Sequence, residues 1–290
     1  MYEKYLKLLG EYISFQSIST DNTFKNEMYQ TAEWLSKTLQ DYGFKTELWT
    51  GSECNPIVYA NYIHDPKAET ILIYGHYDVQ PADKADGWNA NPFTVTEVKG
   101  RLVARGIVDN KGQNLIHIVT VGELIKQNAL KYNVLFMIEG NEETANPDIP
   151  TIVAKNKKKL ACDYIMISDG EISGTTPTIE ASLRGGFNMK VTLTTGKSNL
   201  HSGIYGGGIP SASHEMTKLL GGLYDKNNRV VVPGFYDNAP TITTAHKKNN
   251  ASIQSPATIM KTAGVRAITP ETGHDFFTQV GLRPTMQVTG

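Results

Sequence analysis

Up to about residue 180, stretches with apolar residues at helical spacing alternate with short, continuous apolar blocks. The spacing predicts helices over residues 2–15, 25–42 and 113–127. In the third helix, one face would carry Leu115, Ile118, Val119, Gly122 and Ile125. The apolar blocks predict strands at "KTELW", "PIVYANYI", "ILIY", "YNVLFMIEG" and "DYIMISDG". This alternation predicts an α/β fold, in which helices cover both faces of a mostly parallel sheet.

The pattern changes near residue 184. Residues 185–195, "GGFNMKVTLTT", alternate like a half-exposed strand. A glycine-rich loop, "HSGIYGGGIP", follows, and "SASHEMTKLLGGLY" has the pattern of a capped helix. We therefore predict a larger domain over residues 1–183 and a smaller α+β domain over residues 184–290.

The charge balance and the cysteine content indicate which partners, which metal sites and which cellular setting to expect. The chain has 28 basic and 29 acidic side chains, so no net field attracts nucleic acid or an anionic membrane, and a small polar substrate is expected. Cys54 and Cys162 are far apart, which argues against a disulfide framework or a cysteine metal site. No signal peptide or membrane span is evident, since no segment approaches the roughly 20 apolar residues that a span needs. The expected setting is the cytoplasm.

Three of the buried strands end in ionisable residues. They are followed by His76 and Asp78, by Glu139, Glu142 and Glu143, and by Asp169 and Glu171. Ligands of open parallel sheets bind outside the carboxyl ends of the strands, so these side chains should converge on one site. Asp109 precedes a predicted helix, in a turn that can aim its carboxylate at the same place.

Several carboxylates cannot share a dry pocket as anions unless a cation neutralises them. One histidine with three or four carboxylates, and no cysteine, suits zinc, manganese or cobalt. An aspartate that bridged two such ions would complete a two-metal hydrolytic site. Taken alone, these residues leave two interpretations open, a metal-dependent hydrolase or ordinary polar caps at strand ends.

Five ordered motifs carry a resemblance to a known family. "GHYDVQPADKADGWNANPF", "RGIVDNKGQN", "EGNEE", "ISDG" and "HSGIYGGGIP" resemble the two-zinc peptidases that include aminoacylase-1, carboxypeptidase G and the carnosine-type dipeptidases. The Trp-x-x-x-Pro-Phe form at Trp88–Phe93 is most similar to the dipeptidase branch. The resemblance implies a zinc-peptidase catalytic domain with an inserted lid domain that forms a homodimer. It also implies hydrolysis of an amide bond in a dipeptide or small peptide.

The resemblance also implies a set of metal ligands. His76 and Asp169 resemble the family's ligands of the first zinc, and Asp109 its bridging ligand. Glu143 resembles a ligand of the second zinc. The cofactors implied are thus two divalent ions, zinc being expected and manganese or cobalt being alternatives.

The catalytic roles follow in the same way. Glu142 resembles the general base that takes a proton from the metal-activated water. Asp78 stands where the family has an acid that orients the histidine ring, and His201 where a lid histidine stabilises the oxyanion in the partner's site. The glycines of the loop after His201 would approach the substrate closely; they are Gly206, Gly207 and Gly208. His117, on an apolar helix face, is expected to be a packing residue.

One departure from the family pattern weakens the functional expectation. Full-length relatives supply a further histidine near their C-terminus as the last ligand of the second zinc, and this sequence ends before it. We therefore expect weak second-site binding and little activity from these residues alone. Alternatives are an N-acyl-amino-acid amidohydrolase or desuccinylase, and a non-catalytic dimerising or peptide-binding fragment. A serine hydrolase and a zincin are disfavoured, because neither Gly-x-Ser-x-Gly nor His-Glu-x-x-His occurs.

Overall fold

The computed structural model describes residues 2–170, 179 and 184–289. The chain divides into two compact units, residues 1–171 and 172–290, which are described separately. Their boundary lies earlier than the predicted one between residues 183 and 184, and residues 171–178 and 180–183 lie outside the described part. The catalytic and lid roles of the two parts stay predictions.

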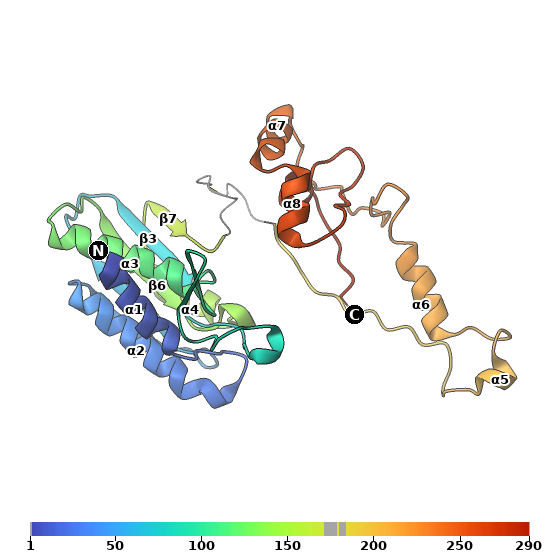
Figure 1. Cartoon of the computed structure of the whole chain (residues 1–290), viewed down its shortest axis with the longest axis horizontal. Helices are drawn as coiled ribbons and strands as arrows, with labels where there is room; N and C mark the ends of the chain where they lie inside the picture. Colours follow the sequence, from blue (N-terminus) through green and yellow to red (C-terminus); the bar gives the residue numbers. More distant parts are fainter. Residues whose placement is uncertain (1, 171–178, 180–183, 290) are drawn as a thin grey trace. The chain divides into compact units, whose positions relative to one another are not determined.

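Figure 1 labels the main elements of the first unit. Its helices are α1 (Tyr2–Ser14), α2 (Lys25–Asp41), α3 (Lys111–Lys126) and α4 (Ile149–Lys155). Its strands are β1 (Lys45–Trp49), β2 (Ile57–Tyr62), β3 (Thr70–His76), β4 (Thr96–Val98), β5 (Arg101–Val103), β6 (Asn133–Glu139) and β7 (Tyr164–Ile167). The apolar pattern predicts α1, α2 and α3 and the five strands β1, β2, β3, β6 and β7. It does not predict the short strands β4 and β5.

The described strands of the first unit form a mixed sheet in the order β1-β2-β6-β3-β7 and a small hairpin of β4 and β5. β3 lies between β6 and β7 and is parallel to both, whereas β1 and β2 are added antiparallel at one side. The parallel part and the helices confirm the α/β prediction. Parallel pairing also brings the carboxyl ends of β3, β6 and β7 to the same edge, which is what the site requires.

Both faces of the sheet are covered at β3 and β6, which explains the continuous apolar runs of these two strands. On one face, Ile73 and Phe136 join a core that includes residues of α1, α2 and α3. On the other face, Leu72 and Met137 pack in a second core with Ile152 of α4. The predicted face of α3 is buried at Leu115, Ile118, Val119 and Gly122 and partly buried at Ile125.

Strand β7 differs from its prediction as a buried strand. All four of its residues are exposed; Ile165, for example, is 63% exposed. Among the described residues, β7 pairs only with β3 and stands at the edge of the sheet. The apolar run identified the strand correctly, but it did not reveal that no described helix covers it.

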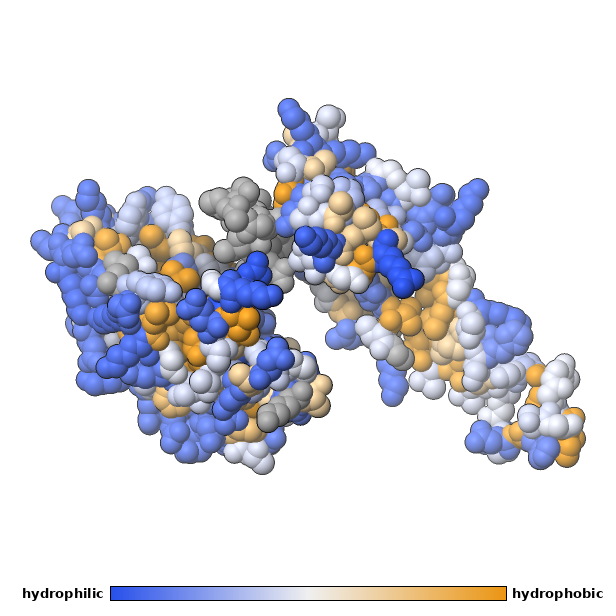
Figure 2. All heavy atoms as spheres, in the orientation of Figure 1, coloured by the Kyte–Doolittle hydropathy of each residue, from blue (hydrophilic) through white to orange (hydrophobic). Residues whose placement is uncertain are grey.

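The regular elements in the described part of the second unit are helices, and long irregular segments connect them. These helices are α5 (Ser202–Tyr205), α6 (Ala212–Gly221), α7 (Thr244–Ile253), α8 (Pro256–Ala263) and α9 (Phe276–Leu282). α6 confirms the helix predicted in "SASHEMTKLLGGLY". Apolar side chains of α5 and α6 remain exposed, including Ile204 and Leu219 (Figure 2).

The strand predicted at residues 185–195 is wrong for the part of the chain that the structure describes. Residues 184–195 carry no regular secondary structure, and Phe187 is 87% exposed. A strand needs a neighbour that accepts and donates its ladder hydrogen bonds. The β pairing found among the described residues of this unit is the isolated bridge between Tyr224 and Val230.

No helix in the described part of the chain has the length and apolar character that crossing a membrane requires.

The packing of α3 against Tyr42 gives a test of the first unit's core. A methyl group at Gly122 would lie 2.1 Å from Tyr42 Cδ1, so Gly122→Ala should lower the free energy of unfolding by about 1–3 kcal/mol. The matched control is Gly10→Ala in α1, where a methyl group meets nothing within 4 Å. That change should be neutral or stabilise by up to about 1 kcal/mol.

Urea unfolding followed by tryptophan fluorescence measures both changes, because Trp34, Trp49 and Trp88, the three tryptophans of the chain, all lie in the first unit. Equal unfolding midpoints for the two variants would contradict the described contact between α3 and Tyr42.

Candidate metal centre

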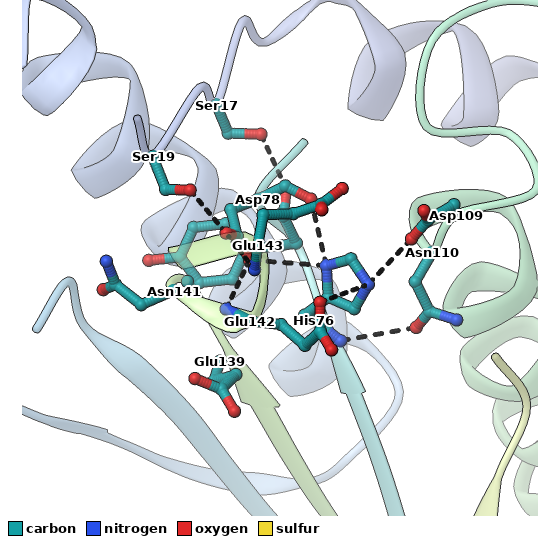
Figure 3. Close-up of polar contacts among 12 residues, drawn as sticks. Ser17, Ser19, His76, Asp78, Asp109, Asn110, Glu139, Asn141, Glu142 and Glu143 are labelled. Carbon is teal, nitrogen blue, oxygen red and sulfur yellow. Dashed lines mark hydrogen bonds and ion pairs between the residues drawn. The ribbon is translucent and has the colours of Figure 1, made fainter. Parts of the chain in front are cut away.

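Four polar side chains meet at the carboxyl edge of the parallel strands. Figure 3 shows three of them, His76, Asp109 and Glu142. His76 is the last residue of β3, and Asp169 follows β7 by two residues. Glu142 begins a short 3-10 turn after β6, and Asp109 precedes α3. The convergence of these four is the one that the strand ends predict.

The imidazole Nε2 of His76 is the centre of this cluster. It lies 2.9 Å from Asp109 Oδ1, 3.5 Å from Asp169 Oδ2 and 4.0 Å from Glu142 Oε2. The atom is buried and forms no hydrogen bond. One ligand atom each of His76, Asp109 and Asp169 lie within 4.8 Å of one another. A buried ring nitrogen that has no hydrogen bond and lies among carboxylate oxygens fits a divalent metal ion of the zinc, manganese or cobalt type.

The other ring nitrogen is fixed by Asp78. His76 Nδ1 lies 3.0 Å from the backbone carbonyl of Asp78 and 3.3 Å from its Oδ1. This contact turns Nε2 toward the other carboxylates, as expected for a histidine that binds a metal. Burial lowers the pKa of His76, but the carboxylates of Asp169 and Asp78 outweigh it and raise the pKa to about 11. Without a cation, the ring therefore carries a proton.

Glu142 combines partial burial with proximity to other acids. Burial raises the pKa of its carboxyl group, His76 opposes this effect, and the charges of Asp169 and Glu143 raise the pKa further. Its side chain is still 44% exposed, so water can reach the carboxylate. A raised pKa and access to water suit a group that first accepts a proton and then releases it.

Glu143 is placed beside the cluster but not in it. Its Oε2 accepts a hydrogen bond of 2.8 Å from Gln80 Nε2, and its backbone N–H donates to Asp78 Oδ2. Among the described residues, the ligand group contains His76, Asp109 and Asp169 and not Glu143. Its role at a second ion stays a prediction.

Two further acids that follow predicted strands are Glu139 and Glu171. Glu139 does not join the cluster, which corrects the expectation that it would converge with the others. Its buried carboxylate accepts hydrogen bonds from Tyr74 Oη at 2.5 Å and from Asn146 Nδ2 at 2.7 Å. Glu171 lies outside the described residues.

Asn110 was not singled out from the sequence, although it follows Asp109 in one of the motifs. Its Nδ2 donates to the carbonyl of Ser168 at 2.6 Å and to Asp169 Oδ1 at 3.1 Å, while its Oδ1 accepts from the His76 backbone N–H. Asn110 thus links β3 to the segment after β7. Gly75 makes room for it, since a methyl group there would lie 2.5 Å from Asn110 Oδ1.

Lys111 attaches the start of α3 to the end of α1. Its side chain is fully buried, and Nζ donates to the carbonyls of Phe15 at 2.7 Å and Tyr12 at 3.2 Å. These carbonyls lie at the C-terminal end of α1, where the helix dipole favours a cation. The contact holds the residues after Asp109 in place.

The remaining histidines of interest lie outside the cluster. His117 is hydrogen bonded through Nε2 to Ser168 Oγ at 2.7 Å, and burial lowers its pKa. His201 is an exposed residue of the second unit; it caps α5, with Nδ1 accepting from the Gly203 N–H at 3.0 Å. Gly206–Gly208 form the exposed turn that follows α5, and Gly207 has a φ of 78°. The roles predicted for His201 and these glycines stay predictions.

Comparisons with known proteins identify relatives of the chain. The pattern of the peptidase family M20/M25/M40 matches residues 72–289. The Beta-Ala-His dipeptidase of Homo sapiens is 33% identical over 258 residues, 83% of this chain and 51% of its own length. The Cys-Gly metallodipeptidase of Schizosaccharomyces pombe is 30% identical over 256 residues, 83% of this chain and 54% of its own. The crystal structure of human carnosine dipeptidase 1 is similar with a TM-score of 0.72 at 27% identity, covering 93% of this chain and 60% of that one.

The chain spans about half the length of these two curated relatives. The family pattern nevertheless covers both the metal-centre motifs and nearly all of the second unit. By this match, the chain belongs to the peptidase family M20/M25/M40.

Proposed function

We propose that the first unit binds divalent metal ions and that the protein hydrolyses the peptide bond of dipeptides or small peptides. The observation that carries this proposal is the buried Nε2 of His76, which has no hydrogen bond and faces the carboxylates of Asp109 and Asp169. The names of the two curated relatives support a dipeptide as the substrate.

Four side chains would hold two ions, with zinc as the expected metal and manganese or cobalt as alternatives. His76 and Asp169 would bind the first ion, Glu143 the second, and Asp109 both. Asp109 suits the shared position because its Oδ1 faces His76 while its side chain is 57% exposed. When bound, the ions would polarise the amide carbonyl and lower the pKa of the attacking water.

We assign the proton transfers to Glu142. Its carboxylate takes a proton from the water as the oxygen adds to the amide carbon, and returns it to the leaving nitrogen as the C–N bond breaks. The products are a carboxylic acid and a free amine, and transfer of the acid's proton to the amine leaves a carboxylate and an ammonium group. The raised pKa of Glu142 supports this assignment, because the same group must act first as base and then as acid.

The second unit would contribute to substrate binding. His201 is proposed to stabilise the oxyanion, because its Nδ1 accepts from Gly203 and so leaves the ring proton on Nε2. The turn Gly206–Gly208 would approach the substrate carboxylate. A homodimer formed through this unit and a cytoplasmic setting are part of the same proposal, and the free thiols of Cys54 and Cys162 support the latter.

Metal content tests the ligand assignment. After dialysis against zinc, elemental analysis of the wild-type chain should find bound zinc, and Asp109→Ala should lose it, because Asp109 serves both ions. His64→Ala, which removes an exposed histidine outside the cluster, is the matched control and should keep the wild-type content. A wild-type content in Asp109→Ala would exclude Asp109 as a ligand.

Replacing Glu142 and Glu143 one at a time distinguishes the proposed base from the proposed metal ligand. Glu142→Gln should retain wild-type zinc and lose about 10²- to 10⁴-fold in kcat on Beta-Ala-His or Cys-Gly. Glu143→Gln should instead lose the second, more weakly held ion and keep the first. If both variants lost zinc equally, Glu142 would be a ligand and not the base.

Substrate profiling on the same samples separates the dipeptidase from an N-acyl-amino-acid amidohydrolase. Preference for a free amino terminus supports the former, and preference for an acylated one the latter.

Zinc binding should release protons. The pKa of His76 is raised to about 11, so at any pH below that value the apo ring is protonated and zinc must displace the proton. The apparent zinc affinity should therefore rise about tenfold per pH unit from about pH 6.5 to 8.5. Calorimetric titration in two buffers of different ionisation enthalpy counts the protons. An affinity that is constant over this range would contradict a protonated His76.

A further inference from the structure

The segment that follows α1 lies along the metal-binding loop. Ser17 Oγ donates to the Tyr77 carbonyl at 2.6 Å, and Val79 N–H donates to the Ser17 carbonyl at 2.9 Å. Ile18 forms a parallel bridge with Val79, and both side chains are buried in a small apolar cluster. Residues 17–19 therefore extend beside β3 beyond its end, and this places Ser19 next to Asp78 (Figure 3).

Asp78 accepts hydrogen bonds from several parts of the first unit. Its side chain is fully buried, and its Oδ2 accepts from Ser19 Oγ at 2.6 Å and from Glu143 N–H at 3.1 Å. Its Oδ1 accepts from Glu142 N–H at 3.1 Å and lies 3.3 Å from His76 Nδ1. The Asp78 carboxylate thus fixes the ring of His76, a proposed metal ligand. It also fixes the backbone of Glu142, the proposed base, and of Glu143, the proposed ligand of the second ion.

Ser19 contributes a side-chain donor to this carboxylate. The hydrogen bond is short and charge-assisted, and such bonds are stronger than those between neutral groups. Without it, Oδ2 would keep only the Glu143 N–H among the partners described above, and the carboxylate could rotate about χ2, whose well is broad.

We propose that Ser19 is a positioning residue, which fixes the Asp78 carboxylate and through it the His76 ring and the 142–143 backbone. The proposal deepens the proposed function and rests on it. Ser19 touches no proposed ligand oxygen, so its effect must pass through Asp78.

Three variants of the full chain test this role. Ser19→Ala removes the donor, and Ser19→Thr restores a hydroxyl at the same position. Ser17→Ala is the matched control, because it removes a neighbouring hydrogen bond of equal length that ends on a backbone carbonyl and not on Asp78.

The first measurement needs no metal. Amide hydrogen exchange at Glu142 and Glu143 should be several-fold faster in Ser19→Ala, because both N–H groups bond to Asp78. Ser19→Thr should restore slow exchange. Ser17→Ala should lower the urea midpoint and leave exchange at these two amides unchanged. Unchanged exchange in Ser19→Ala, or equal acceleration in Ser17→Ala, would overturn the positioning role.

The second measurement is zinc affinity by competition with a chromophoric chelator. Ser19→Ala should bind zinc about tenfold more weakly, and Ser17→Ala should bind it as the wild type does. Equal affinity in Ser19→Ala and wild type would overturn the effect on the metal centre. A wild-type chain that bound no zinc would overturn the proposed function, while the amide measurement would still decide whether Ser19 positions Asp78.

Discussion

A buried carboxylate needs partners, and the partners of Asp78 hold the first unit's site together. An anion removed from water is costly unless hydrogen bonds and positive charge compensate it. Asp78 obtains these from the loop after α1, from the turn after β6 and from the ring at the end of β3. Three segments that are distant in sequence are thereby fixed around one side chain.

The need of buried charges for compensation also explains how the carboxylates around His76 act. Asp109, Asp169 and Glu142 surround His76 Nε2, and the carboxylates of Asp169 and Asp78 raise the pKa of the ring. In the apo protein a proton supplies the compensating positive charge, and a divalent ion supplies it better because it neutralises more than one carboxylate. The arrangement is therefore built around a cation whether or not a metal is present.

The sequence predicts those parts of the fold that follow from periodicity. The apolar runs of β3 and β6 and the buried face of α3 are found where the pattern places them. His76 and Asp169 meet because parallel strands bring their carboxyl ends to one edge, a rule that requires no side-chain detail. Asp109 joins them from the turn before α3.

Features that depend on a neighbour could not be predicted in this way. The alternation in residues 185–195 suits a strand, but no described strand pairs with it, and the apolar run of β7 does not indicate what covers it. Glu139 follows the same rule as His76, yet Tyr74 and Asn146 hold it elsewhere. The contact of Ser19 with Asp78 joins residues 59 positions apart and has no periodic signature.

Residues at and just after the end of α1 contact two separate parts of the site. The carbonyls of Tyr12 and Phe15 accept hydrogen bonds from Lys111, which lies two residues after Asp109. Ser19, a few residues further on, donates a hydrogen bond to Asp78. Local unfolding of this short stretch would therefore release the Asp109 loop and the Asp78 partner of His76 in a single opening event. By mass action, an ion bound at the site opposes that opening, so occupancy of the metal centre and fraying of the first helix are linked equilibria.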